Sequence, residues 1–352
     1  MALLEVKDLH TYFKTKRGIV KAVYGVSYAI ESGRTLGIVG ESGSGKSVSA
    51  MSILRLLDGN GYIESGEIIF EGQDMTKVPL KEIQKIRGNK ISVIFQEPMT
   101  SLNPVFKVER QIGESFMVHQ GMNRKRAYEE SKKMLSDVQI PNPDKVAKQY
   151  PFQLSGGMRQ RVMIAMALAC RPHMLIADEP TTALDVTIQA QILKLMNELK
   201  RGNGASILFI THDLGVINEM ADDVAVMYCG QVVETAPVRT IFSASVYSHP
   251  YTEGLMTSIP QLDTPQGVKL EAIPGSVPHP LDIPSGCRFA PRCKYCQRQC
   301  NESSPPFLEV MPGQGVRCFY PKKEERAAIS GVTPIIVKRE TALKPASNGK
   351  ES

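Results

Sequence analysis

Residues 40–47, GESGSGKS, constrain this chain more than any other stretch. They fit G-x-x-x-x-G-K-[ST], the phosphate-binding loop, whose backbone N–H groups converge on one anion. An apolar run at residues 35–39 precedes the loop, and a helical pattern follows from Ser47 through Leu57. This strand–loop–helix context is the one that the motif requires. We therefore expect the loop to hold a nucleoside triphosphate. The residues expected to touch it or its Mg²⁺ are Gly40, Ser42, Gly43, Gly45, Lys46 and Ser47.

Composition sets the broad class of the chain. Its 352 residues, 42% of them hydrophobic, are enough for one large domain and a smaller one. The net charge of +6 is a mild excess and gives no reason to expect a nucleic-acid partner. No run of about 18 apolar residues is present to span a membrane. The N-terminus lacks the pattern of a secretory signal, so we expect the chain to remain in the cytoplasm.

The pattern of apolar residues predicts an α/β fold. Residues 3–32 alternate as antiparallel strands do, and residues 63–72 predict a second strand pair around a Ser-Gly turn. Residues 97 to about 170 read as a helical insertion, with Asn123 as an N-cap. Continuous apolar runs then mark buried parallel strands.

Two domains and a tail are expected along the chain. Residues 1–242 form the nucleotide-binding domain, in which a hairpin is predicted around Cys229-Gly230. Residues 243–321 are rich in proline and cysteine and form a small irregular C-terminal domain. Residues 322–352 are charged and low in aromatics, which indicates a flexible tail.

Polar side chains follow three predicted strands where each strand ends. Asp178 and Glu179 close one apolar strand, and Gln96 and His212 follow two others. The carboxyl ends of strands in such a sheet meet at one edge, so these side chains are expected beside the phosphate loop. Asp178 suits Mg²⁺, and Glu179 suits a general base that polarises an attacking water.

Residues 154–161, LSGGMRQR, supply a second anion site. Ser155 can cap the helix that follows, and Gly156 and Gly157 leave the N–H groups at its N-terminus open. One chain then carries two half-sites for phosphate. Two subunits placed head to tail would sandwich a nucleotide between them.

The chain combines the phosphate loop with Gln96, LSGG, ADEP at residues 177–180 and THD at residues 211–213. In this combination it resembles the ATPase subunit of ABC transporters over residues 3 to 240. The resemblance implies a P-loop ABC ATPase fold with an antiparallel β subdomain and a helical subdomain. It implies that residues 183–185 link the two ATP sites. Met158 stands in place of a common Gln, and Phe13 in place of a frequent Tyr.

The same resemblance implies a role for each site residue. Phe13 would stack on adenine, Gln96 would sense Mg²⁺ and water, and Glu179 would be the catalytic base. His212 would contact the γ-phosphate. The nucleotide of the opposite subunit would be bound by Ser155 and Gly157.

Five of the seven cysteines lie in one short region. Clustered thiolates suit structural zinc or an iron–sulfur cluster, and the spacing C-x5-C-x6-C-x17-C does not decide between them. Reduced thiols without a metal are the third alternative. The residues concerned are Cys287, Cys293, Cys300 and Cys318, with Cys296 as an additional thiol.

Residues 249–256 and 273–293 resemble the C-terminal region of the peptide-importer branch, which handles dipeptides, oligopeptides and nickel. This resemblance implies a [4Fe–4S] cluster on the four cysteines, with Cys296 departing from the pattern. It implies a second, different ATPase subunit, two membrane permeases and an extracellular substrate-binding protein. The chain would sit peripherally on the cytoplasmic face of a bacterial cell membrane.

Other functions fit part of the pattern. A nickel-chelate importer would use the same ATPase. A non-transport ABC ATPase acting on a ribosome or on DNA usually carries two cassettes or a long coiled-coil insertion, and this chain has neither. A metal-sensing regulatory subunit is a further alternative, but the intact Glu179 and His212 favour hydrolysis.

Overall fold

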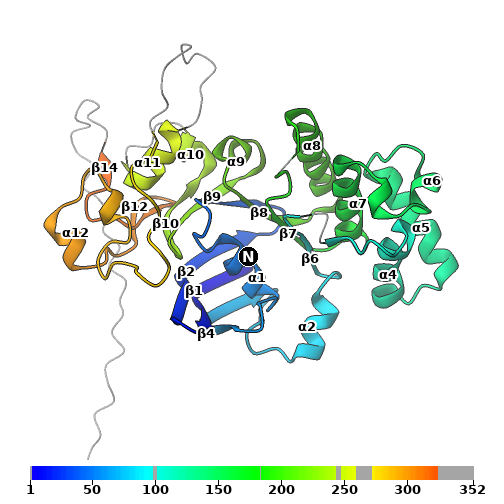
Figure 1. The fold of residues 1–352 in the computed structure, drawn as a ribbon, viewed down its shortest axis with the longest axis horizontal. Helices are drawn as coiled ribbons and strands as arrows, with labels where there is room; N and C mark the ends of the chain where they lie inside the picture. Colours follow the sequence, from blue (N-terminus) through cyan, green and yellow to red (C-terminus); the bar gives the residue numbers. More distant parts are fainter. Residues whose placement is uncertain (1, 98–100, 183, 243–246, 259–271, 324–352) are drawn as a thin grey trace, which may run out of the picture.

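The computed structural model describes residues 2–97, 101–182, 184–242, 247–258 and 272–323. A four-stranded antiparallel sheet in the order β2-β1-β4-β5 forms one layer, seen below the centre of Figure 1. Its strands are β1 (Ala2–Thr15), β2 (Gly18–Glu31), β4 (Gly61–Phe70) and β5 (Gln73–Asp74). The antiparallel strands predicted within residues 3–32 are confirmed by the β1–β2 pair.

An eight-stranded sheet in the order β12-β13-β10-β9-β3-β8-β7-β6 forms the centre of the molecule. Strands β9, β3, β8, β7 and β6 run parallel, and the hairpin predicted at Cys229-Gly230 joins β9 to β10. Every residue of β3, β7 and β8 is buried, as expected where both faces of a parallel sheet are covered. The strands are β3 (Thr35–Val39), β6 (Ile91–Ile94), β7 (Met174–Asp178), β8 (Ser206–Thr211), β9 (Asp223–Tyr228), β10 (Gln231–Pro237), β12 (Leu308–Met311) and β13 (Gln314–Val316).

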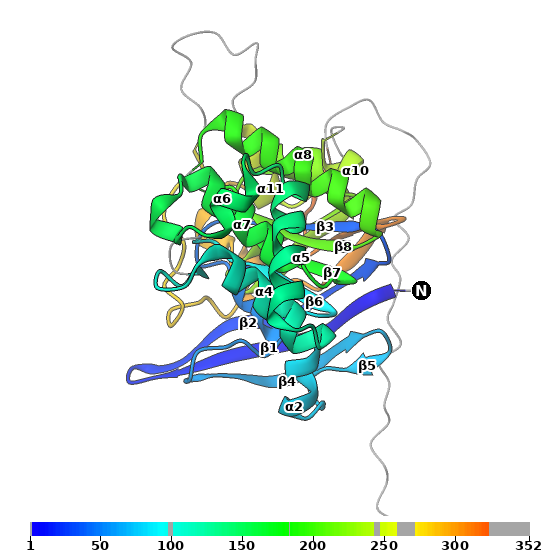
Figure 2. The same cartoon turned by 90° about the vertical axis from the view of Figure 1, so that its right-hand side faces the viewer.

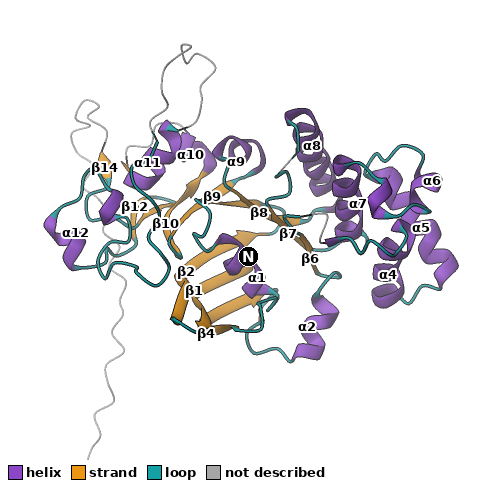
Figure 3. Cartoon of the chain, in the orientation of Figure 1, coloured by secondary structure: helices purple, strands orange, loops and turns teal. Residues whose placement is uncertain are grey.

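Helices gather at one side of the central sheet, at the right of Figures 1 and 3. Figure 2 views the molecule from that side, with α4, α5 and α7 in front of the strands. These helices are α4 (Val108–Gln120), α5 (Arg124–Asp137), α6 (Pro143–Ala147) and α7 (Gly156–Leu168). The other helices are α1 (Lys46–Ile53), α2 (Leu80–Ile86), α8 (Val186–Asn203), α9 (Leu214–Met220), α10 (Val238–Phe242), α11 (Pro250–Thr257) and α12 (Arg298–Glu302), with 3₁₀ turns at Pro151–Gln153 and Ala290–Arg292.

Two hydrophobic cores hold these layers together. One lies between the antiparallel sheet and the central sheet and includes Leu4, Ile38 and Ile68. The other lies between the central sheet and the helices and includes Ile112 and Val162. Each sheet therefore buries apolar side chains against a different layer.

Local capping explains where two helices begin. The Oδ1 of Asn123 accepts a hydrogen bond from the backbone N–H of Arg126 at 3.0 Å, which confirms the predicted N-cap of α5. Asp185 caps α8 in the same way through the N–H of Ile188 at 2.9 Å.

Two local expectations are wrong. Residues 63–72 hold no strand pair around a turn: β4 runs straight through Ser65-Gly66, and its pairing with β1 shifts there by a bulge. Gly66 has φ +100°, and an added Cβ would lie 2.5 Å from the carbonyl oxygen of Asp8. The Ser-Gly pair therefore serves a bulge instead of a turn. Helix α1 ends at Ile53 instead of Leu57, because the chain leaves the helix at Arg55, which has φ +52°.

Part of the C-terminal region continues the central sheet. Strand β13 pairs with β10, and β12 pairs with β13 at the sheet's edge. A further short pair joins β11 (Tyr247–Ser248) to β14 (Lys322–Lys323). The tail predicted to be flexible falls largely on residues 324–352, which lie outside the described residues. Within the described ranges, no helix is long and apolar enough to cross a bilayer.

Candidate ATP site and cysteine pocket

The phosphate loop leaves the buried strand β3 and enters α1, as the sequence predicts. Gly40 has φ +156°, and a Cβ there would lie 2.1 Å from the carbonyl oxygen of Met227. Gly45 has φ +95°, and its added Cβ would lie 2.4 Å from the carbonyl oxygen of Ala22. Both positions therefore require glycine, and the loop can fold tightly enough for its N–H groups to converge.

Lys46 lies inside this loop, with only 5% of its surface exposed. Its Nζ donates to the carbonyl oxygens of Gly40 at 2.7 Å and Glu41 at 3.1 Å. Burial lowers the pKa of the Lys46 ammonium, and the carboxylates of Glu179 and Asp178 oppose that change. A cation held at the mouth of a glycine-rich loop is suited to phosphate oxygens.

Ser47 and Asp178 meet, although 131 positions separate them. The Ser47 Oγ donates to the Asp178 Oδ1 at 2.9 Å. Burial raises the pKa of the Asp178 carboxyl, and the hydrogen bond from Ser47 opposes that shift. The two side chains present adjacent oxygen donors, the kind of ligand that Mg²⁺ prefers, so they fit this ion.

Glu179 is the centre of the polar cluster at the edge of the sheet. Its Oε2 accepts from the Gln96 Nε2 at 3.1 Å and from the Thr182 Oγ1 at 3.0 Å. The same oxygen lies 3.3 Å from the Nδ1 of His212. The Glu179 side chain is 14% exposed, against 61% for His212. The structure thus brings Gln96, Glu179 and His212 together, as their positions after parallel strands predict. The sequence analysis missed Thr182.

The backbone at Glu179 is held in an uncommon conformation. Its φ is +45°, in the left-handed region that a non-glycine residue rarely adopts. The Glu179 N–H donates to the carbonyl oxygen of Ile210 on β8 at 2.9 Å. Non-glycine residues in this region cost about 1–3 kcal/mol and are common at functional sites, where the surrounding structure fixes them.

At the predicted second anion site, the structure shows a capped helix N-terminus. Ser155 is the N-cap of α7, and its Oγ accepts from the N–H of Met158 at 3.4 Å. Ser155 and Gly156 are exposed, and nothing lies within 4 Å of an added Cβ at Gly156. Figure 1 places α7 among the right-hand helices, apart from α1 and its phosphate loop. The N-terminus of α7 therefore faces outward, where another molecule can reach it.

Phe13 lies on β1, paired with Val20 of β2 and Gly61 of β4. Its ring is half-buried and packs so closely over Gly61 that an added Cβ there would lie 2.6 Å from a ring carbon. An aromatic face held in this way suits stacking on a planar base. Its role toward adenine stays a prediction. Of the predicted linking segment 183–185, Ala183 lies outside the described residues.

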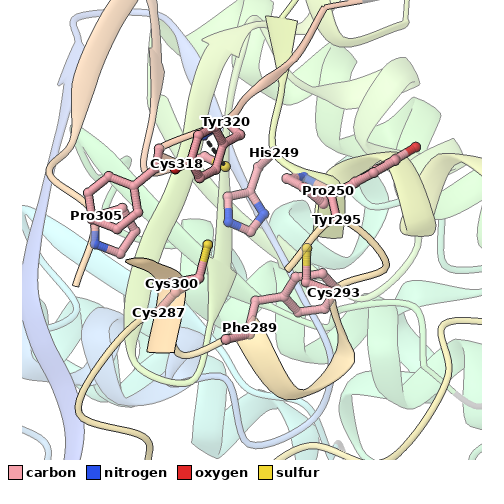
Figure 4. Close-up of a pocket in the computed structure, with 12 residues that line it drawn as sticks. His249, Pro250, Cys287, Phe289, Cys293, Tyr295, Cys300, Pro305, Cys318 and Tyr320 are labelled. Carbon is pink, nitrogen blue, oxygen red and sulfur yellow. Dashed lines mark hydrogen bonds between the residues drawn. The ribbon is translucent and has the colours of Figure 1, made fainter. Parts of the chain in front are cut away.

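Four of the five clustered cysteines line one small pocket (Figure 4). These are Cys287, Cys293, Cys300 and Cys318, while Cys296 is exposed and does not line it. The backbone N–H of Cys287 donates to the carbonyl oxygen of Cys300 at 2.7 Å. Burial raises the pKa of the thiols of Cys287, Cys293 and Cys318, that of Cys293 to about 11 and that of Cys318 to about 12.

The pocket fits a metal in chemistry but not in its present arrangement. Four thiols in a mostly apolar lining are a suitable donor set. Its free volume of about 10 Å³, however, is about that of one water-sized sphere. Across the described ranges, no three His, Cys, Asp or Glu side chains are placed to hold a metal ion. The predicted iron–sulfur cluster is therefore not supported by this arrangement.

Two residues of the C-terminal region also contact the phosphate loop. The guanidinium of Arg292 pairs with the carboxylate of Glu41, and the hydroxyl of Tyr251 accepts from the N–H of Glu41. The sequence analysis missed these contacts, because no local pattern connects residues 41 and 292. The sequence shows only that an arginine precedes Cys293, which does not identify its partner.

Known proteins are similar in sequence to most of this chain. Residues 23–182 match the family described as ABC transporter, and residues 233–300 match the oligopeptide/dipeptide transporter C-terminal region. The oligopeptide transport ATP-binding protein AppD of Bacillus subtilis (strain 168) is 52% identical over 323 residues, 92% of this chain and 98% of AppD. OppD of Escherichia coli (strain K12), which bears the same description, is 49% identical over 92% of this chain and 94% of OppD.

The fold matches solved ATP-binding cassettes. The dimeric structure of the cassette MJ0796 in a post-hydrolysis state, bound to ADP and Pi, aligns with a TM-score of 0.61. The sequences are 28% identical, and the alignment covers 67% of this chain and 99% of that one. The cassette cbiO1 from Clostridium perfringens aligns with a TM-score of 0.58 at 25% identity.

Proposed function

Because the chain belongs to the ATP-binding proteins of the ABC transporter family, in the oligopeptide/dipeptide branch, we propose that it hydrolyses ATP to energise peptide import. The observation that carries this proposal is the meeting of three separate motifs at one edge of the sheet. Lys46, Ser47 and Asp178 suit the phosphates and Mg²⁺, and Glu179 lies beside them within reach of Gln96 and His212.

Each of these side chains has a task in hydrolysis. Mg²⁺, when bound by Ser47 and Asp178, would neutralise charge on the phosphates. Lys46 and the loop N–H groups would orient the γ-phosphate. Glu179 would take a proton from the attacking water, since its Oε2 already accepts from Gln96 and Thr182 and is held in place by them. His212 would donate from its ring to the γ-phosphate.

The outward-facing N-terminus of α7 supports a sandwich of two subunits. Ser155, Gly156 and Gly157 would contact the nucleotide bound to the phosphate loop of a second ATPase subunit. We propose a heterodimer of two different ATPases, docked on two permeases at the cytoplasmic face of the membrane. An extracellular binding protein would deliver the peptide.

The substrate is tested by reconstituting the chain with its permeases, second ATPase and binding protein in vesicles. We expect ATP-dependent uptake of an oligopeptide of about five residues from a panel that also holds a dipeptide and a nickel chelate. The oligopeptide is favoured because AppD and OppD are described as oligopeptide transport proteins. Uptake of the nickel chelate alone would favour the alternative importer. No uptake of any panel member would overturn the proposal.

We further propose that the cysteine pocket opens to hold a [4Fe–4S] cluster, with zinc as the alternative. The support is that the four predicted ligands line one pocket and the extra thiol, Cys296, does not. The buried thiols would release their protons as the metal binds. Such a site would stabilise the C-terminal region and take no part in hydrolysis.

Iron, sulfide and zinc content after anaerobic purification tests this site. We expect about four iron atoms per chain in the wild type and in Cys296→Ser, and a large loss in Cys300→Ser. Zinc in the same pattern would select the alternative metal. No metal in the wild type, or equal loss in both variants, would reject the site.

A further inference from the structure

The C-terminal region contacts the phosphate loop through an ion pair whose arginine is buried. The Nη1 of Arg292 lies 2.9 Å and 3.2 Å from the two carboxylate oxygens of Glu41. Glu41 is the second residue of the phosphate loop, and Arg292 directly precedes Cys293. The Arg292 side chain is 5% exposed, so this charge is almost fully removed from water.

Arg292 is held in place from several sides. Its Nε donates to the carbonyl oxygen of Pro274 at 3.0 Å, and its Nη1 lies 3.5 Å from the hydroxyl of Tyr228. A guanidinium fixed by a carbonyl group and an aromatic neighbour has little freedom to follow a moving partner. The carboxylate of Glu41 is therefore held toward the C-terminal region.

Tyr251 holds the backbone of the same loop residue. It is fully buried, and its hydroxyl accepts a hydrogen bond from the N–H of Glu41 at 2.8 Å. Its ring packs against that of Tyr228, with centroids 4.7 Å apart. Both the backbone and the side chain of Glu41 are thus fixed by residues that follow position 250.

The pairing has an electrostatic consequence for an anionic ligand. A carboxylate in a loop that binds triphosphate repels the triphosphate. Both groups are negatively charged, and charges at short range in a partly buried site are weakly screened. A guanidinium paired with that carboxylate cancels most of the repulsion. Without Arg292, the Glu41 carboxylate would therefore weaken the binding of a triphosphate more than a carboxylate at the protein surface would.

We propose that Arg292 is a positioning residue of the phosphate loop, which holds and neutralises the Glu41 carboxylate so that the triphosphate can bind. The inference rests on the proposed ATP binding and adds a residue outside the nucleotide-binding motifs. It gives the cysteine-bearing segment a direct physical connection to nucleotide affinity.

The test compares the nucleotide Kd and the KM and kcat for ATP in the assembled complex across matched variants. Arg292→Met keeps an unbranched, apolar side chain in place of the arginine stem and removes the guanidinium with its charge. We expect its Kd and KM to rise about tenfold with kcat changed less than about twofold. Arg292→Lys keeps the charge and is expected to lose less than about threefold. Arg298→Met removes an exposed arginine of α12 and is the control, with Kd and KM unchanged.

A double variant separates charge neutralisation from a purely structural role. Glu41→Gln removes the repelling charge and is expected to bind nucleotide tighter than the wild type. Glu41→Gln with Arg292→Met is expected to recover most of the affinity lost by Arg292→Met alone. A merely structural role, through the carbonyl group of Pro274, predicts no recovery.

Three results would overturn the inference. They are an unchanged Kd in Arg292→Met, no recovery in the double variant, or weaker nucleotide binding in Glu41→Gln. The measurement on Glu41→Gln tests the inference even if Arg292→Met fails to fold. If the wild type binds nucleotide without hydrolysing it, the proposed function fails, while the Kd comparison still tests Arg292.

Discussion

At the scale of single residues, the proposed hydrolysis depends most on Glu179. One of its oxygens accepts from Gln96 and Thr182 and faces His212, so the carboxylate is oriented by three neighbours. Its backbone has φ +45°, a left-handed conformation that non-glycine residues adopt mainly where the surrounding structure fixes them. A base fixed in this way needs no reorganisation when the water is bound.

Replacing Glu179 with Gln keeps the shape and removes the base. We expect ATP binding within about threefold of the wild type and hydrolysis slower by about 10²–10⁴-fold, measured as phosphate release under single-turnover conditions. Glu71→Gln is the matched control, because Glu71 pairs with Lys90 and His173 outside the site. Near-normal turnover in Glu179→Gln would remove Glu179 from the role of base.

His249 gives a prediction for pH. It is buried, its Nδ1 accepts from the N–H of Tyr251, and burial lowers its pKa to about 3 from about 6.5. Between these values the unfolded chain binds the proton and the folded chain does not, so His249 makes stability fall as the pH drops below 6.5. The loss between pH 7 and pH 5 is at most about 2 kcal/mol.

Asn at position 249 can still cap α11, so His249→Asn tests this effect. Urea unfolding at pH 7 and pH 5 is the measurement. The loss of stability on acidification is expected to be smaller in the variant than in the wild type. The neighbouring carboxyl of Glu234, whose pKa burial raises, is present in both proteins and cancels in the comparison. The same loss in both would contradict the role assigned to His249.

At the scale of elements, the helix α7 has two separable properties. Ser155 caps it, and its N-terminus is open to another molecule. The cap of α5 by Asn123 provides a comparison within the same group of helices, since it has the first property and no proposed contact with nucleotide.

Ser155→Ala and Asn123→Ala should therefore differ in activity and agree in stability. Each loss of a cap is expected to cost about 1 kcal/mol of unfolding free energy. Only Ser155→Ala is expected to reduce ATP turnover in the assembled complex, by about tenfold or more. Thermal melts and turnover rates of both variants check this. Equal turnover in the two variants would reject a nucleotide contact by Ser155.

The elements also show what local sequence can predict. The buried strands β3, β7 and β8, the cap at Asn123 and the hairpin at Cys229 follow from periodicity and capping, which act within a few residues. The bulge at Gly66 was mistaken for a turn, because Ser-Gly serves both and only the pairing with β1 decides. The convergence of Gln96 and Glu179 was predictable from parallel strand ends, while the Arg292–Glu41 pair was not, since it depends on packing between distant segments.

At the scale of the whole molecule, the phosphate loop before α1 and the capped N-terminus of α7 are the two half-sites that we propose for ATP. The phosphate loop sits at the centre of the sheet, and the N-terminus of α7 lies among the outer helices (Figure 1). A solved cassette of the same fold is dimeric. Two subunits arranged head to tail would let each half-site complete the other, and hydrolysis would then separate them.

The C-terminal region belongs to this whole-molecule account. Strands β12 and β13 extend the central sheet, and Arg292 pairs with the phosphate loop. The C-terminal region is therefore attached to the nucleotide-binding domain by strand pairing and by the buried charge of Arg292. A structural change in the cysteine pocket would alter the position of the phosphate loop through these contacts.

We propose that peptide transport and ATP hydrolysis by this chain are one coupled process. The most direct measurement is the rate of phosphate release by the complete complex in vesicles, with and without an oligopeptide bound to its binding protein. The account predicts that the peptide raises the rate in the wild type and that Glu179→Gln abolishes both phosphate release and uptake. A rate indifferent to peptide, or uptake that persists in Glu179→Gln, would contradict it.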